Sequence, residues 1–154
     1  MAEKEIRLDE KVVVRSLAPW NTGATRKTTI GDITIPAKGT VYLTREEIIA
    51  QAQNGNKLVN GIDGYGSHAT WYIEDAYTRR DLGFETEDKT QEFLTSDGIK
   101  KIFDLKTPKS FEDNIKKKVV TRAEKSFLME CIKTLGINDY NRIQFCIEHT
   151  GIKL

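Results

Sequence analysis

The spacing of apolar residues changes near Phe84, and this change divides the chain into two stretches of different character. Before it, short runs either alternate between apolar and polar residues or are rich in β-branched residues, which is typical of strands. After it, apolar residues recur three and four positions apart, which is the spacing of one helical face. The pattern predicts the α+β class, with a β-rich module at 11–84 followed by a helical module at 95–154.

Two polar segments flank these modules. A charged N-terminal arm occupies residues 1–10, and a linker at 85–94 joins the modules. The sequence FETEDKTQ, at 84–91, is charged and has no apolar periodicity. We therefore expect it to be an exposed connector that proteases cut first.

The β-rich module is predicted to be a meander or a barrel-like sheet of short strands. Apolar and polar residues alternate at 33–35 and at 41–43, around the sequence PAKG. Proline fixes φ for a tight turn and glycine accepts a positive φ, so these two runs are expected to pair as a hairpin. Further strands are expected at 12–14, 27–30 and 69–73.

One short helix is expected to interrupt the strands. Thr44 and Glu47 have the spacing of a capping box, in which each side chain bonds a free backbone N–H at the helix start. The helix should therefore begin at Arg45, and Asn54 with Gly55 supplies a left-handed stop.

The helical module is predicted to be a bundle of three to four short helices. Each has a polar residue able to cap its first turn, and the capping residues are Thr95 or Ser96, Ser110, Thr121 with Glu124 three residues later, and Asp139. Gly136 and Gly151 are expected to end the last two helices.

The composition narrows the class of protein. The 24 Lys and Arg residues nearly balance 23 Asp and Glu residues, which disfavours a protein that grips nucleic acid through its backbone phosphates. No apolar run approaches the ~20 residues of a membrane span. The N-terminal sequence MAEKEIRLDEK lacks the apolar segment of a secretory signal, which indicates synthesis in a cytoplasm. Disulfides are disfavoured there.

The glycine-rich sequence GIDGYGSHATWYIED, at 61–75, is the first candidate site. A phosphate-binding glycine loop requires a helix directly after it, whereas ATWYI is typical of a strand. A long hairpin loop after Lys57-Leu58-Val59 is the favoured interpretation. His68 could act as a base or ligand, but no nucleophile or second histidine completes a catalytic set, so a structural histidine is favoured.

Other chemistry in the sequence is sparse. Cys146 and His149 lie three residues apart, a spacing that some metal sites use, but Cys131 would be the only further soft ligand. Buried free cysteines are the favoured interpretation, and no metal, cofactor or catalytic residue is predicted.

Five lysines form the nearest approach to a basic patch. Their ordinary role is a solvated helix face, and the alternative is contact with nucleic acid; they are Lys100, Lys101, Lys116, Lys117 and Lys118.

Two aromatic residues lie in turn sequences and are candidates for contact with a partner. Trp20 follows a proline and an apolar strand, which favours a lid over the core. Tyr65 lies between two glycines that cannot shelter it, so we expect an exposed contact residue. Trp71 and Tyr72 should point to opposite faces of a strand, one into the core and one outward.

Three segments, VVVRSLAPW, GDITIPAKGTVYLTREEIIAQAQNGN and GIDGYGSHATWYIED, carry a family resemblance. Over residues 11–85 the chain resembles accessory proteins of tailed bacteriophages of Gram-positive bacteria. The resemblance implies a virion or phage-genome context, and it transfers no catalytic motif.

Two functions follow as expectations. The leading one is a non-enzymatic structural protein of the virion, a head decoration or auxiliary capsid component, made in the host cytoplasm and bound to other virion proteins or to copies of itself. The alternative is an intracellular phage protein that binds a host or defence factor, or a nucleic-acid complex, through the lysines named above. An enzyme is the least favoured class.

Overall fold

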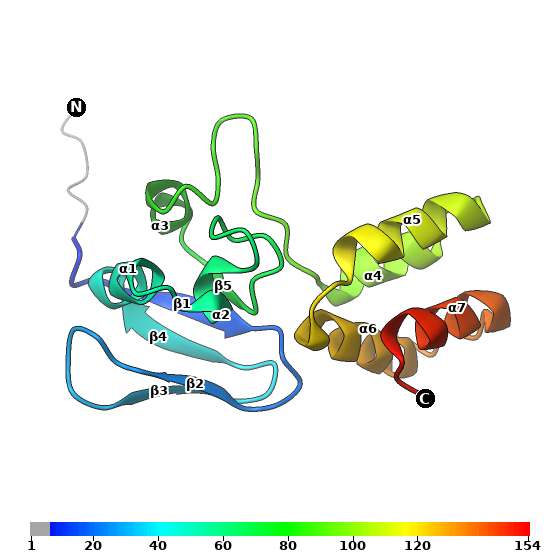
Figure 1. Ribbon diagram of the computed structural model, residues 1–154, viewed down its shortest axis with the longest axis horizontal. Helices are drawn as coiled ribbons and strands as arrows, with labels where there is room; N and C mark the ends of the chain where they lie inside the picture. The colour runs from blue at the N-terminus through cyan, green and yellow to red at the C-terminus, as the bar shows by residue number, and fades with distance from the viewer. Residues whose placement is uncertain (1–6) are drawn as a thin grey trace.

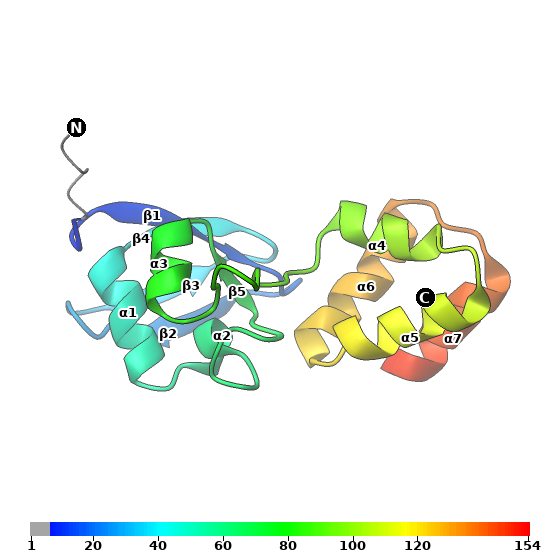
Figure 2. The same cartoon turned by 90° about the horizontal axis from the view of Figure 1, so that it is seen from above.

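The computed structural model describes residues 7–154, and it places the β-rich part and the helical part end to end (Figures 1 and 2). The strands are β1 (Lys11–Ser16), β2 (Thr22–Thr25), β3 (Asp32–Ile35), β4 (Thr40–Thr44) and β5 (Trp71–Ile73). The helices are α1 (Arg45–Gln53), α2 (Lys57–Asn60), α3 (Ala76–Asp81), α4 (Ser96–Phe103), α5 (Pro108–Lys118), α6 (Arg122–Thr134) and α7 (Tyr140–Thr150). The predicted α+β class is confirmed.

The strands form a three-stranded antiparallel sheet in the order β4-β1-β5 and a separate ribbon of β2 with β3. The predicted hairpin is therefore wrong as a pairing, because β3 pairs with β2 while β4 pairs with β1. The turn itself is present: the Gly39 N–H donates to the Pro36 carbonyl at 2.8 Å. The strand expected at 27–30 is also wrong, since the strand lies earlier, at β2, and 27–30 belongs to the loop that follows it.

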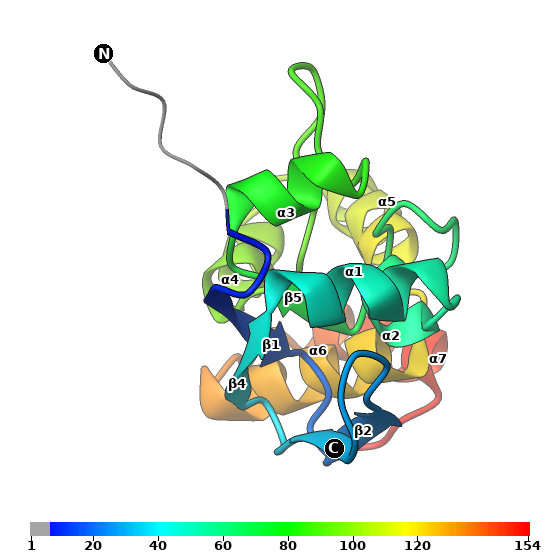
Figure 3. The same ribbon diagram turned by 90° about the vertical axis from the view of Figure 1, so that its left-hand side faces the viewer.

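Three helices accompany the sheet where the sequence predicted one. In Figures 1 and 3, α1 and α3 lie on the opposite side of this part from the β2–β3 ribbon. The segment at 57–59, which the hairpin interpretation placed before the glycine-rich loop, forms the single turn α2, capped by the Asn56 side chain. Helix α3 is capped by Asp75, whose carboxylate accepts from the Thr78 N–H. Both helices are too short to show apolar periodicity.

Helix α1 begins at Arg45 as predicted, with the Thr44 hydroxyl accepting from the Glu47 N–H at 3.2 Å. The other half of the predicted capping box is wrong, because the Glu47 carboxylate does not accept a hydrogen bond from the Thr44 N–H. It accepts instead from the backbone N–H groups of Lys27 and Thr28 at 3.0 to 3.3 Å and from the Gln51 side chain at 3.1 Å. Glu47 is 1% exposed, and it fixes the loop between β2 and β3 to α1.

One buried cluster lies within the β-rich part. It joins the sheet, the ribbon and α1, and its members are Val12, Val14, Ile33, Ile35, Leu43, Ile48, Val59, Trp71, Ile73 and Phe84. The Trp71 indole N–H donates to the Thr22 hydroxyl at 2.8 Å, which ties β5 to the ribbon. Trp71 is thus the core residue of the predicted pair, and Tyr72 is half-buried.

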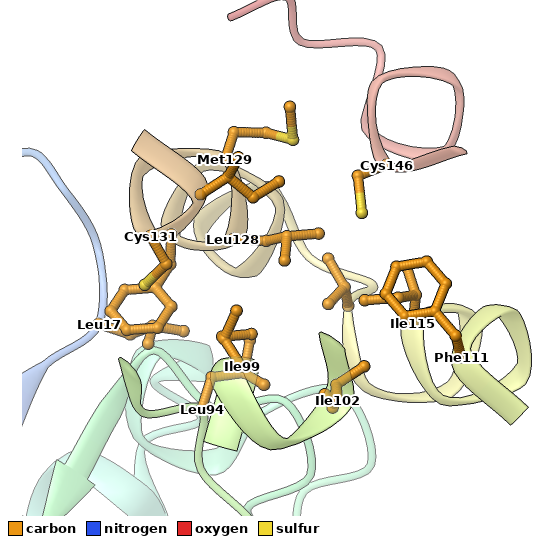
Figure 4. Close-up of a cluster of buried hydrophobic side chains, with 13 residues drawn as sticks. Leu17, Leu94, Ile99, Ile102, Phe111, Ile115, Leu128, Met129, Cys131 and Cys146 are labelled. Atoms are coloured by element: carbon orange, nitrogen blue, oxygen red, sulfur yellow. The ribbon is translucent and has the colours of Figure 1, made fainter. Parts of the chain in front are cut away.

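A second buried cluster fills the four-helix bundle (Figure 4). Phe111 and Ile115 of α5 lie in it with Leu128 of α6, and Phe111 packs edge-on against Phe103 and Phe145. The four helices agree with the prediction, and so do the caps of α4, α6 and α7, including the full capping box of Thr121 and Glu124. One start differs: α5 begins at Pro108, capped by Thr107, since proline suits the first turn of a helix.

The connector differs from the expected exposed segment at both ends. Phe84 is 1% exposed within the β-rich cluster, and Gln91 is buried against the glycine-rich loop. Leu94 joins the helical cluster. Residues 86–90 are exposed, and they form the loop that projects in Figures 1 and 3. The burial of Phe84 and Gln91 was missed because single buried residues between polar ones show no periodicity.

Limited proteolysis is expected to cut first at 86–90, within this projecting loop. Cleavage requires an extended, accessible backbone, and this segment is exposed between two buried anchors. Trypsin at Lys89 followed by mass spectrometry of the fragments tests it. Earlier cleavage at Lys27, in the loop that Glu47 holds, would contradict the prediction.

Candidate functional site

The loop at 61–68 is held in one conformation by its own polar groups. The Asp63 carboxylate accepts from the backbone N–H groups of Tyr65 at 2.8 Å and Ser67 at 3.1 Å, and from the Ser67 hydroxyl at 2.7 Å. Burial acts to raise the pKa of Asp63, but these hydrogen bonds hold it below its ordinary value. Gly61 has φ +73°, and a Cβ there would lie 2.1 Å from the Ser67 carbonyl oxygen. The loop connects α2 to β5, so it is not the predicted hairpin loop.

Two large apolar side chains project from this rigid loop. Ile62 is 61% exposed and Tyr65 is 60% exposed. The exposure expected for Tyr65 is confirmed, and its ring lies beside Gly83. Trp20 lies elsewhere: it is half-buried, and the Arg122 guanidinium of α6 stands 5.3 Å from the centre of its ring.

His68 bridges the two parts of the molecule. Its Nδ1 lies 2.8 and 3.0 Å from the two carboxylate oxygens of Glu124 in α6. The same carboxylate accepts from the backbone N–H groups of Val120 and Thr121. Glu124 is 5% exposed. Its carboxylate caps the start of α6 and, through His68, joins that start to the loop. The favoured structural role of His68 agrees with this geometry, although its partner is 56 residues away and has no local signal in the sequence.

The further contacts across the junction are an aromatic stack, an ion pair and an apolar contact. Tyr72 of β5 stacks on Phe93 with ring centres 5.0 Å apart. Lys38 pairs with Glu130 of α6, and Leu17 reaches into the helical cluster. Tyr72, the outward-facing member of the Trp71–Tyr72 pair, is therefore partly covered by the connector.

A cleft of about 530 Å³ opens at this junction. The glycine-rich loop forms one wall, the connector forms a second, and the ends of α4, α5 and α6 form the third. The side chains that border it include Tyr65, His68, Lys89, Gln91, Phe93, Ile102, Lys117, Lys118 and Glu124.

The structure separates the lysines that the sequence grouped. Lys117 and Lys118 border the cleft. The Lys116 ammonium lies 5.9 Å from the centre of the Phe145 ring, and Lys100 borders a different hollow of about 290 Å³ near Leu135. The pair that borders the cleft was not distinguishable in sequence from Lys116, because the sequence does not show which side of the helix faces the junction.

The cysteine and histidine of α7 have separate surroundings. Cys146 is fully buried, and burial raises the pKa of its thiol to about 12. His149 Nε2 lies 2.7 Å from the Val119 carbonyl oxygen, and its ring stacks on Phe145. Burial also raises the pKa of Cys131. Within residues 7–154, no three His, Cys, Asp or Glu side chains gather as a metal site would require.

Comparison of the chain with protein-family models, curated proteins and solved structures gives no match. Among the helices of residues 7–154, none combines the length and the apolar character needed to cross a membrane.

Proposed function

We propose that this chain is a non-enzymatic component of a tailed-phage particle, a head decoration or auxiliary capsid protein that binds the particle's protein surface. The observation that carries the proposal is the rigid loop at 61–67, which presents Ile62 and Tyr65 to solvent. The phage context is supported by the resemblance of residues 11–85 to accessory phage proteins.

A preformed loop favours tight binding to protein. Asp63 fixes the backbone before any partner arrives, so little conformational entropy is lost on association. Tyrosine is enriched among the residues that dominate interface energies, because its ring buries a large area with few rotatable bonds. Strand β4 adds a second exposed aromatic, Tyr42, at 68% exposure on the outer strand of the sheet.

Of the predicted N-terminal arm at 1–10, residues 1–6 lie outside the described residues, and only residues 7–10 can be placed. Arg45 holds the end of the arm: its guanidinium donates to the Arg7 carbonyl at 3.1 Å and to Glu10 at 3.2 Å. It also pairs with Asp75 at 2.9 Å, and this guanidinium holds the pKa of Asp75 below its ordinary value.

Replacing Tyr65 by alanine is expected to weaken binding to particles at least roughly tenfold while leaving the melting temperature nearly unchanged, because the ring is mostly exposed. Tyr140→Ala is the matched control, since Tyr140 is 74% exposed on the helical part. Co-sedimentation with phage particles measures binding, and thermal denaturation measures stability. A large loss of stability with binding intact would show that Tyr65 supports the fold instead of the interface.

Mass spectrometry of purified particles tests the location directly. The chain should be present in stoichiometric amounts in particles of the phage that encodes it. Its absence from particles would overturn the proposal. Binding to nucleic acid that falls steeply with salt would instead support the intracellular alternative.

A further inference from the structure

The cleft at the junction carries the charge of an anion-binding site. Lys89 of the connector and Lys117 and Lys118 of α5 all border it. Thr95 and Gly98, at the start of α4, border it too, and a helix start carries partial positive charge. A volume of about 530 Å³ lies within the range of small-molecule sites.

The two acidic residues that border the cleft, Glu92 and Glu124, offset this charge only in part. Glu124 is already engaged by His68 and by the N–H groups of Val120 and Thr121. Glu92 is exposed and has no ion pair among the described residues. Three lysines therefore face one unengaged carboxylate, and lysine is a common phosphate ligand because it acts as a compact charge.

The floor of the cleft also holds an unpaired acceptor. The Gln91 side-chain N–H donates to the Gly66 carbonyl at 3.0 Å, which fixes the orientation of the amide because the reverse orientation would set two oxygens together. Gln91 is 6% exposed, and its Oε1 has no hydrogen-bond partner within residues 7–154. This oxygen is itself covered, so an N–H donor of a ligand reaches it only after the Gln91 side chain rotates away from Gly66.

The remaining wall is apolar and partly aromatic. Phe93, Leu94 and Ile102 border the cleft, and Tyr65 stands at its exposed rim. Aromatic rings and flat heterocycles stack favourably. The lining of the cleft therefore combines positive charge, aromatic side chains and an amide.

We propose that the cleft binds a nucleoside phosphate of mononucleotide size. The phosphate lies against Lys117, Lys118 and Lys89, and the base lies along Phe93 with a donor directed toward Gln91. This site goes beyond attachment to a particle, and either proposal can fail without the other.

Isothermal titration of the full chain with adenosine 5′-monophosphate tests the site, with adenosine and inorganic phosphate as separate probes. The monophosphate should bind saturably, and each separate probe should bind at least roughly tenfold more weakly. The double variant Lys117→Gln/Lys118→Gln should weaken binding of the monophosphate at least roughly tenfold. The matched control is Lys106→Gln/Lys109→Gln, which removes the same charge near the other end of α5, away from the cleft.

Three results would overturn the proposal. The first is the absence of saturable binding of the monophosphate at millimolar concentration in a chain whose melting curve is intact. The second is an equal loss of affinity in both double variants, which would mean a diffuse charge effect. The third is tighter binding of a single-stranded oligonucleotide than of the monophosphate, which would assign the lysines to a nucleic-acid surface. Gln91→Leu adds a readout independent of charge: affinity for the monophosphate falls while affinity for inorganic phosphate is unchanged.

Discussion

Replacing Phe111 by alanine is expected to lower the free energy of unfolding of the helical part by about 4 kcal/mol, the usual cost of removing a buried phenylalanine ring. Phe111 is 1% exposed, packs against Phe103 and Phe145, and lies beneath the Arg142 guanidinium, which is 4.8 Å from its ring centre. Alanine leaves a cavity between α4, α5 and α7, where Phe103, Phe145 and Arg142 surround the ring. The cost is large because such surroundings relax only partly to fill a cavity.

The same substitution also tests the division into two modules. Both tryptophans lie in the β-rich part, but Trp20 also contacts Arg122 of α6, so the measurement is made in a Trp20→Phe background in which Trp71 reports on the β-rich cluster. Far-ultraviolet circular dichroism reports mainly on α4 to α7, which contain most of the helix. The two buried clusters are separate, so Phe111→Ala should shift the dichroism transition in urea and leave the fluorescence transition nearly in place.

The reciprocal variant is the control. Phe84 is equally buried but belongs to the cluster of the β-rich part, so Phe84→Ala should shift the fluorescence transition instead. If the dichroism and fluorescence transitions shift together in both variants, the chain unfolds as one unit. The division into modules at 11–84 and 95–154 would then be wrong for its stability.

The helical part was largely predictable because its signals are local. Capping side chains such as Thr95 and Thr121 act within three residues of themselves, and Gly151 ends α7 in the left-handed conformation that its sequence position indicates. The cap of α5 differed from the prediction: Thr107, followed by Pro108, caps the helix three residues before Ser110.

The pairing of strands was not predictable in the same way. The alternation at 33–35 and 41–43 correctly indicates strands, but it does not say which strand lies beside which. The choice is made by burial: Ile33 and Ile35 join the core by pairing with β2, and β4 pairs with β1. Sequence patterns specify the faces of a strand, whereas its neighbours are chosen by packing over long distances.

The candidate site was the least predictable feature. The exposed Tyr65 could be inferred from its flanking glycines, since no neighbour in sequence could cover it. The contact of His68 with Glu124 and the unpaired Gln91 Oε1 arise where residues 25 to 56 positions apart meet. Glu124 was correctly assigned to a capping box, and that local role does not reveal that the same carboxylate receives a histidine from the other part of the molecule.

Glu47→Gln is expected to lower the free energy of unfolding by about 2 kcal/mol near neutral pH, because a buried carboxylate that receives several hydrogen bonds loses its charge. The Glu47 carboxylate accepts from the N–H groups of Lys27 and Thr28, from the Thr28 hydroxyl and from Gln51. Glutamine keeps one acceptor oxygen and brings an NH₂ group that must face these donors.

The pH dependence of this cost distinguishes a lost charge from a general packing defect. Burial acts to raise the pKa of Glu47, but the hydrogen bonds outweigh it and hold the pKa below the ordinary value of 4.5. The carboxylate therefore contributes its full stability above that ordinary value, and the contribution is lost as pH falls through the lower pKa of the folded state. The difference in stability between the natural chain and Glu47→Gln should accordingly shrink as the solution is acidified below pH 4.5.

Urea denaturation followed by tryptophan fluorescence over a series of pH values measures this difference. Glu46→Gln is the matched control, since Glu46 is the exposed neighbour in the same turn of α1 and should show little cost at any pH. A cost for Glu47→Gln that stays constant from neutral to acid pH would mean that the shape of the side chain, and not its charge, holds the loop between β2 and β3 to the helix.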